Sequence, residues 1–436
     1  MQLIVKRTTQ LNGTATLPSS KSECIRGIFF ALLAEGESTL DNMLHSDDIE
    51  DAIQVGKLLG AKISREGDRL RVTGCPLPLQ TNAQTIYSGN SGLTTRFALP
   101  LLGFREQAEQ TIVLDCGEQM RARPIRPLIT VVSRLGMNIE YLSKDGCCPI
   151  AVSGTLQGGQ AEVDGLSSQY LSALLIALPC ADRDSVITVN NLMSEPYAEL
   201  TLNWLREQGI VHTHQRKDDT DIFHIQGRQR YQPFSKTITG DFSSASYFIA
   251  AAALTQGQIL LHGLDMQHPQ GDKKLVNILQ NMGADISITS DQLLIRGGKP
   301  LHGLAIDANE IPDLLPTLAV IGTQASGETH IYNVRHAREK ETDRIHSMAE
   351  GLSQMGAKVI ATEDGLTLYP SELHGARVKG FGDHRTVMAL TVAGMLAKKE
   401  ETIISDAEAI NKTFPTFVSL MQSLGGNISL SEQGNE

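Results

Sequence analysis

The 436-residue sequence has no apolar run long enough to span a membrane, and no N-terminal apolar segment of the signal-peptide kind. We therefore expect a cytoplasmic protein with no membrane partner. The sequence has only six cysteines, without CxxC spacing or a histidine-rich companion: Cys24, Cys75, Cys116, Cys147, Cys148 and Cys180. This pattern predicts reduced thiols and argues against a zinc site or a disulfide framework.

Two common nucleotide-binding motifs are also missing. The sequence contains no GxxxxGK[ST] loop, and no GxGxxG follows a predicted strand. Nucleotide hydrolysis and dinucleotide redox chemistry are therefore poorly supported. The formal net charge of −11 means that the molecule as a whole repels nucleic acid, so clusters of Lys and Arg become informative about local anion sites.

The sequence does contain an internal repeat with an interval of roughly 70 residues. In each unit we expect an amphipathic helix that ends at a glycine C-cap, then a short strand, a polar turn and a second strand. This interval is too long for a solenoid and suits a βαβ-type module. The six glycines are Gly60, Gly136, Gly209, Gly283, Gly356 and Gly425.

The length predicts roughly two to three domains, and six units fit two domains of three. The fourth unit begins with GDFSSASYFIAAAAL, just after Thr239. We therefore predict one domain at residues 17–239 and a second formed by residues 1–16 with 240–436, so that both chain ends share a domain. The expected fold class is α/β.

The stretch PSSKSECIR, residues 18–26, places Lys21 where an extended run becomes a buried helix. A cation is disfavoured at the positive end of a helix dipole. An exposed basic turn is one interpretation. The other is a bound anion that neutralises both charges, with Ser22 and Arg26 on one helix face.

Similar helix starts recur along the chain. Each alone is most often a simple turn, cap or solvated helix. Their recurrence on a repeated scaffold instead predicts helix N-termini that converge on one or two highly charged anions. The residues at or beside these starts are Gly92, Arg96, Arg121, Arg123, Arg126, Ser167, Ser168, Gln169, Arg338, Lys340, Arg344, Arg385 and Lys412.

Two carboxylates are candidates for proton transfer. Asp313 lies in ANEIPDLLPTLAV, and Glu341 lies among cations in AREKETDRI. Glu341 alone could be a structural ion pair. With a facing Asp313 it becomes a candidate acid–base couple.

In chain order, the motifs PSSKSECIR, GNSG, RARP, SSQYLSALL, EPY, GDFSSASYF, IPD, KETDR, GDHR and KTFP resemble the 5-enolpyruvylshikimate-3-phosphate synthase family over essentially the whole length. Its members are also called 3-phosphoshikimate 1-carboxyvinyltransferases. The resemblance implies a two-domain inside-out α/β barrel, built from six repeated βαβ-type units of parallel helices and mixed sheets. Its active site would lie in the cleft between the domains.

The resemblance also implies an activity. The enolpyruvyl group of phosphoenolpyruvate would pass to the 5-hydroxyl of 3-phosphoshikimate, giving 5-enolpyruvylshikimate 3-phosphate and phosphate. This reaction belongs to the shikimate pathway to chorismate and the aromatic amino acids. A cytoplasmic monomer with no metal or organic cofactor would follow, with these two small molecules as its partners.

The resemblance assigns roles to residues of this sequence. Asp313, Glu341 and Lys21 would be catalytic. Phosphoenolpyruvate would be held by Lys21, Gly92, Arg123, Gln169, Arg344, Arg385 and Lys412. The phosphorylated shikimate would be held by Lys21, Ser22, Arg26, Ser167, Ser168, Gln169, Ser194, Tyr197, Asp313 and Lys340.

Four positions depart from the family pattern. Leu93 replaces a threonine, Phe97 a proline and Glu339 an apolar residue, while His336 stands where some members have a substrate-binding asparagine. Leu93 and Phe97 share a helix face beside Gly92 and lack the threonine hydroxyl. We therefore expect reduced sensitivity to glyphosate, which competes with phosphoenolpyruvate in this family.

Three alternatives remain open. A diverged enolpyruvyl transferase acting on a UDP-sugar would share the fold, although KETDR and SSQYLSALL favour the shikimate enzyme. A Ser–Lys hydrolase built on SSKS would use Ser20 or Ser22 as nucleophile. A non-enzymatic sixfold clamp would need a basic lumen along its repeats.

Overall fold

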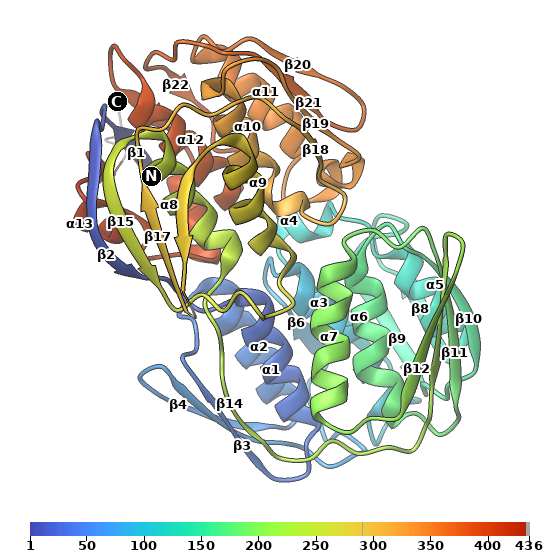
Figure 1. Ribbon diagram of the computed structural model, residues 1–436. Helices are drawn as coiled ribbons and strands as arrows, with labels where there is room; N and C mark the ends of the chain where they lie inside the picture. Colours follow the sequence, from blue (N-terminus) through green and yellow to red (C-terminus); the bar gives the residue numbers. More distant parts are fainter. Residues whose placement is uncertain (290, 433–436) are drawn as a thin grey trace. The chain divides into compact units, whose positions relative to one another are not determined.

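The structure is a computed structural model that describes residues 1–289 and 291–432 (Figure 1). The chain forms two compact units. Unit 2 is Lys21–Ile238, and unit 1 combines Met1–Ser20 with the chain from Thr239 onward. The sequence analysis placed these boundaries at residues 17 and 239–240.

The described residues form six four-stranded sheets, three in each unit, and all six share one strand pattern. One edge strand is parallel to its neighbour, and the other two pairings in the sheet are antiparallel. This mixture is the one expected for repeated βαβ-type units, because a parallel pair needs a crossover and an antiparallel pair needs only a tight turn.

The three sheets of unit 2 have the strand orders β14-β3-β5-β4, β6-β7-β9-β8 and β10-β11-β13-β12. Their strands are β3 (Glu37–Asp41), β4 (Lys62–Glu66), β5 (Arg69–Thr73), β6 (Thr85–Tyr87), β7 (Ile112–Asp115), β8 (Met137–Tyr141), β9 (Ile150–Gly154), β10 (Gln160–Asp164), β11 (Ser185–Asn190), β12 (His212–Lys217), β13 (Thr220–Ile225) and β14 (Ser235–Thr237).

The three sheets of unit 1 have the strand orders β16-β17-β15-β2, β18-β19-β21-β20 and β22-β23-β1-β24. Their strands are β1 (Gln2–Val5), β2 (Gln10–Thr16), β15 (Gln256–His262), β16 (Asp285–Ile288), β17 (Gln292–Arg296), β18 (Ala305–Asp307), β19 (Thr329–Tyr332), β20 (Val359–Ala361), β21 (Leu366–Leu368), β22 (Arg377–Val378), β23 (Thr402–Ile404) and β24 (Ile428–Ser431).

The N-terminal segment belongs to unit 1 through backbone pairing. Strand β1 lies between β23 and β24 and is antiparallel to both. Strand β2 runs parallel to β15 along its whole length. Two sheets of unit 1 are therefore completed by the first residues of the chain.

Each unit contains long helices that are buried on nearly all sides. A helix buried all round shows no polar face, which is why these segments read as continuous apolar runs in the sequence. They are α1 (Lys21–Leu33), α3 (Gly92–Leu101) and α6 (Ser168–Ala177) in unit 2, and α8 (Phe242–Leu254), α10 (Leu315–Gln324) and α12 (His384–Leu396) in unit 1.

The remaining helices are half-buried, with one apolar face against the core, or short. The α-helices are α2 (Asp47–Leu58), α4 (Glu118–Arg121), α5 (Arg126–Arg134), α7 (Glu195–Glu207), α9 (Lys274–Met282), α11 (Arg344–Gln354) and α13 (Phe417–Ser423). Short 3₁₀ helices are η1 (Leu102–Phe104), η2 (Leu178–Cys180), η3 (Gly271–Lys273), η4 (Pro312–Leu314), η5 (Arg335–Glu339) and η6 (Ala407–Lys412).

Within each unit the helices lie inside and the sheets outside, as Figure 1 shows. Each unit has its own hydrophobic core. The predicted α/β class, with an inside-out arrangement of mixed sheets, is confirmed.

The predicted glycine C-caps are confirmed as well. Gly60, Gly136, Gly209, Gly283, Gly356 and Gly425 all have positive φ, between 67° and 114°. They follow the helices α2, α5, α7, α9, α11 and α13 in turn, and each precedes a strand. Side chains are strained in this backbone region, so glycine marks the helix end.

All six cysteines are buried thiols that form no disulfide. Among the described residues, we find no helix that combines the length and the hydropathy needed to cross a membrane. Nor do those residues include a cluster of three or more His, Cys, Asp or Glu side chains suited to a metal ion.

Candidate active site

The predicted anion-binding turn of unit 2 ends at Gly92, the first residue of α3. Ser91 is the N-cap, and its hydroxyl accepts a hydrogen bond from the Thr94 amide at 3.3 Å. The Thr95 hydroxyl contacts the Ser91 carbonyl and the Ser88 hydroxyl, each at 2.8 Å. The other amides of the first turn have no partner within the helix, which suits an anion.

Two guanidinium groups converge on this turn. A methyl group at Gly92 would lie 2.7 Å from Arg123 Nη1 and 2.8 Å from Arg96 Nη1. Arg96 Nη1 donates to Gln169 Oε1 at 2.6 Å, and Arg96 Nη2 to the Pro124 carbonyl at 2.9 Å. The fold thus brings Gly92, Arg123 and Gln169 together, with the buried Arg96 linking them.

The same turn alters the expectation about Leu93 and Phe97. Both side chains are buried in the core, and Phe97 packs edge-on against Phe29 with ring centroids 5.5 Å apart. The hydroxyl anchor that a threonine at position 93 would supply is present at Thr94 and Thr95 instead. Reduced glyphosate sensitivity stays a prediction, and it now rests on repacking alone.

Lys21 is the first residue of α1, as expected, but its counter-charge is a side chain. Its ammonium lies 2.8 Å from Asp48 Oδ2, and both side chains are largely buried. Asp48 therefore neutralises Lys21 from within the unit, a pairing that neither the exposed-turn nor the bound-anion interpretation included. Asp48 lies at the start of α2, where the helix dipole also favours its charge.

Arg26 is 1% exposed and fastens α1 to α6 and α7. It donates to the Thr201 hydroxyl at 2.8 Å, the Ser172 hydroxyl at 3.3 Å, and the carbonyls of Tyr197 at 2.7 Å and Ser22 at 3.0 Å. Burial lowers the pKa of Arg26 to about 10. The four hydrogen bonds engage most of the guanidinium donors of Arg26 inside the unit.

The other predicted residues of unit 2 also lie at helix starts. Ser167 is the N-cap of α6, and its hydroxyl accepts from the Gln169 amide at 3.4 Å. Ser168 is the first residue of the same helix. Ser194, 2% exposed, has left-handed backbone angles just before α7 and bonds through its carbonyl to the Tyr197 amide.

The centre of the unit 1 cluster is Arg344, the first residue of α11. Its guanidinium reaches three carboxylates: Glu341 at 2.5 Å, Asp313 at 2.6 Å and Asp383 at 2.8 Å. The arginine side chain is 1% exposed. Burial opposes the charge, yet the carboxylates prevail and the pKa of Arg344 is raised.

Asp313 also pairs with Arg385, at 2.7 Å. Burial alone would raise the pKa of Asp313, but Arg385, Arg344 and Lys340 outweigh it and hold the pKa well below its usual range. The predicted couple of Asp313 and Glu341 is therefore joined through the shared Arg344. In this arrangement Asp313 is ionised and is a weak base.

The remaining predicted cations of unit 1 lie around this cluster. Lys412, at the end of η6, donates to the Gly382 carbonyl at 3.0 Å, just before the N-cap Asp383. Lys340 follows η5 and acts electrostatically on Asp313. His336 is buried, and burial together with Lys340 lowers its pKa to about 3, so its imidazole is neutral.

Two acidic residues of the site were not among the residues predicted from the sequence. Asp48 pairs with the predicted cation Lys21, and Asp383 pairs with Arg344. Asp383 lies in the GDHR motif, whereas Asp48 lies in SDD, which was not among the motifs considered. An acidic residue at a predicted helix start is itself a signal, because it caps the helix or offsets its dipole. Asp383 does both, since its Oδ1 accepts from the Arg385 amide at 2.7 Å.

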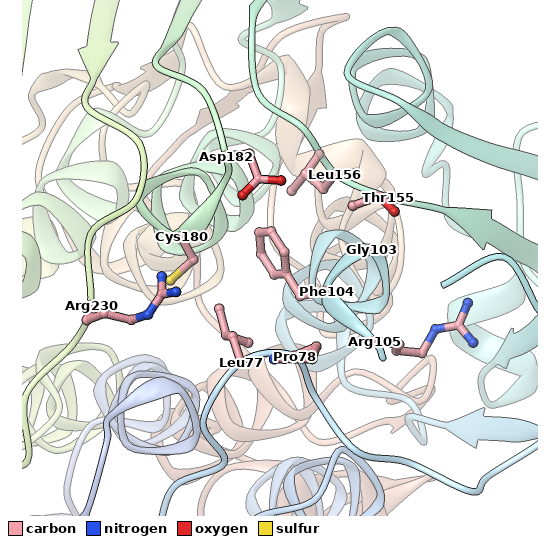
Figure 2. Close-up of a pocket in the computed structure, with 10 residues that line it drawn as sticks. All are labelled: Leu77, Pro78, Gly103, Phe104, Arg105, Thr155, Leu156, Cys180, Asp182 and Arg230. Carbon is pink, nitrogen blue, oxygen red and sulfur yellow. The ribbon is translucent and has the colours of Figure 1, made fainter. Parts of the chain in front are cut away.

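A separate pocket of about 210 Å³ in unit 2 contains none of the predicted residues (Figure 2). Its Cys180 is buried, and burial raises the pKa of the thiol to about 12, which disfavours the reactive thiolate. Its lining residues are Leu77, Pro78, Gly103, Phe104, Arg105, Thr155, Leu156, Cys180, Asp182 and Arg230.

The model of the family described as EPSP synthase (3-phosphoshikimate 1-carboxyvinyltransferase) matches residues 5–421. A protein of that second name from Acetivibrio thermocellus is 42% identical over 430 residues, covering 99% of this chain and 100% of its own. One from Methanococcoides burtonii is 41% identical, covering 97% and 98%.

The chain belongs to the EPSP synthase family.

The solved structures agree at the level of fold. An EPSP synthase from Acinetobacter baumannii matches with a TM-score of 0.82 at 24% identity, covering 99% of this chain and 100% of its own. The enolpyruvyl transferase NikO from Streptomyces tendae matches with a TM-score of 0.78 at 16% identity, covering 99% of each chain. The predicted family and its shikimate-pathway transferase activity are confirmed over the UDP-sugar, hydrolase and clamp alternatives.

Proposed function

We propose that this EPSP synthase family member transfers the enolpyruvyl group of phosphoenolpyruvate to the 5-hydroxyl of 3-phosphoshikimate, with the residues of both units in the roles that the sequence suggested. The observation that carries these roles is the Arg344 cluster. It combines two candidate acid–base carboxylates with two cations in one buried network. Such a network suits a substrate that carries both a carboxylate and a phosphate.

In unit 1, Arg344 and Arg385 offer N–H donors to the carboxylate of phosphoenolpyruvate, with Lys412 nearby for charge. Both guanidiniums are engaged by Asp313. A substrate carboxylate that takes over these donors would weaken their hold on Asp313. The pKa of Asp313 would then rise toward its ordinary range, and the residue would become a better base for the 5-hydroxyl proton.

Glu341 exchanges a proton at the methylene carbon of phosphoenolpyruvate. Protonation there makes the adjacent carbon electrophilic, and the 5-hydroxyl oxygen bonds to it while Asp313 takes the hydroxyl proton. The bond from that carbon to the phosphate oxygen then breaks as the methylene group is restored by return of a proton to Glu341. Phosphate leaves, and Lys21, Arg123 and the Gly92 turn stabilise its charge.

The phosphorylated shikimate is assigned to the helix starts of unit 2, with Asp313 and Lys340 from unit 1. Its hydroxyl and phosphate contacts come from Ser22, Arg26, Ser167, Ser168, Gln169, Ser194 and Tyr197. We propose that the two half-sites meet around both anions in the cleft between the two domains. Closure there would exclude water from the reacting atoms.

The net charge and the family resemblance support finer proposals about partners and location. The net charge of −11 argues against nucleic-acid binding, and we propose a cytoplasmic monomer whose partners are its two small substrates. The reaction as written needs no cofactor.

The test is phosphate release on mixing phosphoenolpyruvate with 3-phosphoshikimate, compared with each substrate alone. We expect release only with both, and an enolpyruvyl ether product by mass spectrometry. Asp313→Asn should lower turnover at least about 100-fold, since a positioned base contributes that much. Asp307→Asn, an exposed carboxylate of the same unit, is the control and should retain activity. Release with UDP-N-acetylglucosamine instead would overturn the assignment.

A further inference from the structure

A carboxylate outside the assigned site touches the anion-binding turn of unit 2. Asp51 lies in α2, and its side chain rests on the backbone of Gly89. A methyl group at Gly89 would lie 1.8 Å from Asp51 Oδ2 and 2.3 Å from Oδ1, so only glycine fits. The backbone amide of Asn90 donates a hydrogen bond to the same carboxylate.

The turn that Asp51 contacts is linked to two parts of the predicted site, the start of α3 and the segment before Arg123. Three residues on, the turn enters α3 at Gly92. On its other side the Gly89 carbonyl accepts from the Gly117 amide at 2.6 Å, and Asn90 Oδ1 accepts from the Met120 amide at 3.3 Å. Gly117 and Met120 belong to the segment that leads to Arg123. A shift of the turn would therefore move both the Gly92 amides and Arg123.

The surroundings of Asp51 are acidic. Asp47, Asp48 and Glu50 share its helix. Lys21 of α1 is already paired with Asp48, and Arg65 of β4 with Glu50. Residues 88–95 of the turn carry no ionisable side chain, and β6 beside α2 offers only Tyr87. Burial, then Asp48 and Asp47, raise the pKa of Asp51 to about 7, while the Asn90 amide lowers it.

We propose that Asp51 is a positioning residue that holds the turn at residues 88–92 and sets, through its charge, the affinity of that turn for a phosphate-bearing substrate. This inference rests on the proposed function, in which the turn binds phosphoenolpyruvate. A protonated Asp51 accepts the Asn90 hydrogen bond without adding a negative charge beside the ligand. An ionised Asp51 repels the substrate's anionic groups. Binding of the anion therefore favours the protonated form.

The KM for phosphoenolpyruvate should accordingly rise as the pH increases through about 7. The test compares wild type with Asp51→Asn between pH 6 and pH 9. Asparagine keeps a hydrogen-bond acceptor for the Asn90 amide and has no charge. The phosphate of the substrate also titrates, but it affects both proteins equally, so its effect cancels in the ratio of the two KM values. If bound anion raises the pKa of Asp51 by one unit, the ratio should change about tenfold over this range.

Two further variants separate charge from position. Glu140→Gln removes an exposed charge of the same unit that does not act on Asp51, and its ratio to wild type should stay constant with pH. Asp51→Ala leaves the Asn90 amide without its acceptor, so the KM should rise at every pH. The peptide that contains residues 88–92 should also exchange its amide hydrogens faster in Asp51→Ala than in Asp51→Asn or wild type.

A pH-independent ratio of KM for Asp51→Asn, or equal hydrogen exchange in Asp51→Ala and wild type, would overturn the inference. Neither result bears on the proposed function, which fails only if wild type does not release phosphate from the substrate pair. The exchange measurement needs no turnover, so it decides the positioning role even in that case.

Discussion

At the residue scale, Arg344 combines burial with a high density of charge. Its three carboxylate partners come from the IPD, KETDR and GDHR motifs, and a planar guanidinium can reach all three at once. Lysine keeps the charge and loses this geometry. The arginine is thus required for its shape as well as its charge.

We expect Arg344→Lys to lower kcat/KM for phosphoenolpyruvate by about 100-fold or more, since aligned donors are lost. Stability should fall by about 3 kcal/mol, because a buried carboxylate is left without its partner. Steady-state kinetics and urea unfolding measure the two effects. Arg335→Lys, an exposed arginine of the same unit, is the control. Near-normal kinetics in Arg344→Lys would remove this residue from the substrate site.

Gly92 is restricted by the two guanidiniums next to it rather than by its backbone angles. In Gly92→Ala the new methyl group would meet Arg123 and Arg96 at less than 3 Å, and these flexible ends would have to move. We expect the KM for phosphoenolpyruvate to rise about tenfold or more, as displaced binding groups weaken the complex. The KM for 3-phosphoshikimate should change less than about twofold by the same reasoning. Equal effects on both substrates would contradict this placement.

At the element scale, helix starts deliver most of the predicted side chains. Lys21, Gly92, Ser168 and Arg344 each open a helix, and Arg385 is the second residue of α12. A helix start offers backbone amides without partners in the helix and the positive end of the helix dipole. The backbone therefore attracts anionic groups there, in addition to any basic side chains.

Two N-cap serines of unit 2 form a matched pair. Ser91 accepts the Thr94 amide at the start of α3, whereas Ser46 at the start of α2 makes no side-chain cap bond and has a buried hydroxyl without a partner. Ser91→Ala should cost about 1 kcal/mol in the free energy of unfolding. Ser46→Ala should cost nothing or stabilise slightly, because it removes an unsatisfied polar group. Equal losses in urea unfolding would refute the distinction.

At the scale of the whole molecule, buried carboxylates with opposite pKa shifts should shape stability against pH. The pKa of Asp313 is lowered, so its ion pairs stabilise the protein above pH about 4 and are lost as the pH falls below its native pKa. The pKa of Asp272 is raised to about 7 by burial and by Asp313. The unfolded chain releases that proton first, so stability falls as the pH rises from about 4 to about 7.

Asp313→Asn should therefore lower the urea midpoint at pH 8, whereas Asp272→Asn, which still accepts from the Ser243 hydroxyl, should raise it. The Asp272→Asn difference should shrink near pH 4, whereas the Asp313→Asn difference should persist there, because the Asp313 ion pairs are lost only at lower pH. Urea titrations at pH 4, 6 and 8 measure these midpoints. A change of the same sign in both variants at pH 8 would contradict the assigned shifts.

Ligand binding should also change the shape of the molecule in solution. Each unit holds cations that are paired with its own carboxylates. Two anions that engage both sets would draw the units together. We expect small-angle scattering to give a smaller radius of gyration with 3-phosphoshikimate, and smaller still when an analogue of phosphoenolpyruvate is added. An unchanged radius with both ligands at saturation would argue against closure.

Much of this protein is determined by the sequence alone. The repeated glycines mark helix ends because only glycine enters the left-handed region without strain, and continuous apolar runs mark helices buried on all sides. The motifs at helix starts identify the family and most candidate side chains. The glycine helix ends, the apolar runs and the helix-start motifs are all determined by residues close together in the sequence, so they can be predicted from it.

The tertiary structure decided which charges meet. Asp48 pairs with Lys21, Asp383 with Arg344, and Asp51 rests on Gly89 across gaps of 27 to 39 residues. It also placed β1 beside β23, from opposite ends of the chain. Such contacts follow from the packing of whole helices and strands, which local periodicity does not encode. The partners of the predicted cations, and with them the pKa shifts of the site, became visible only in the folded protein.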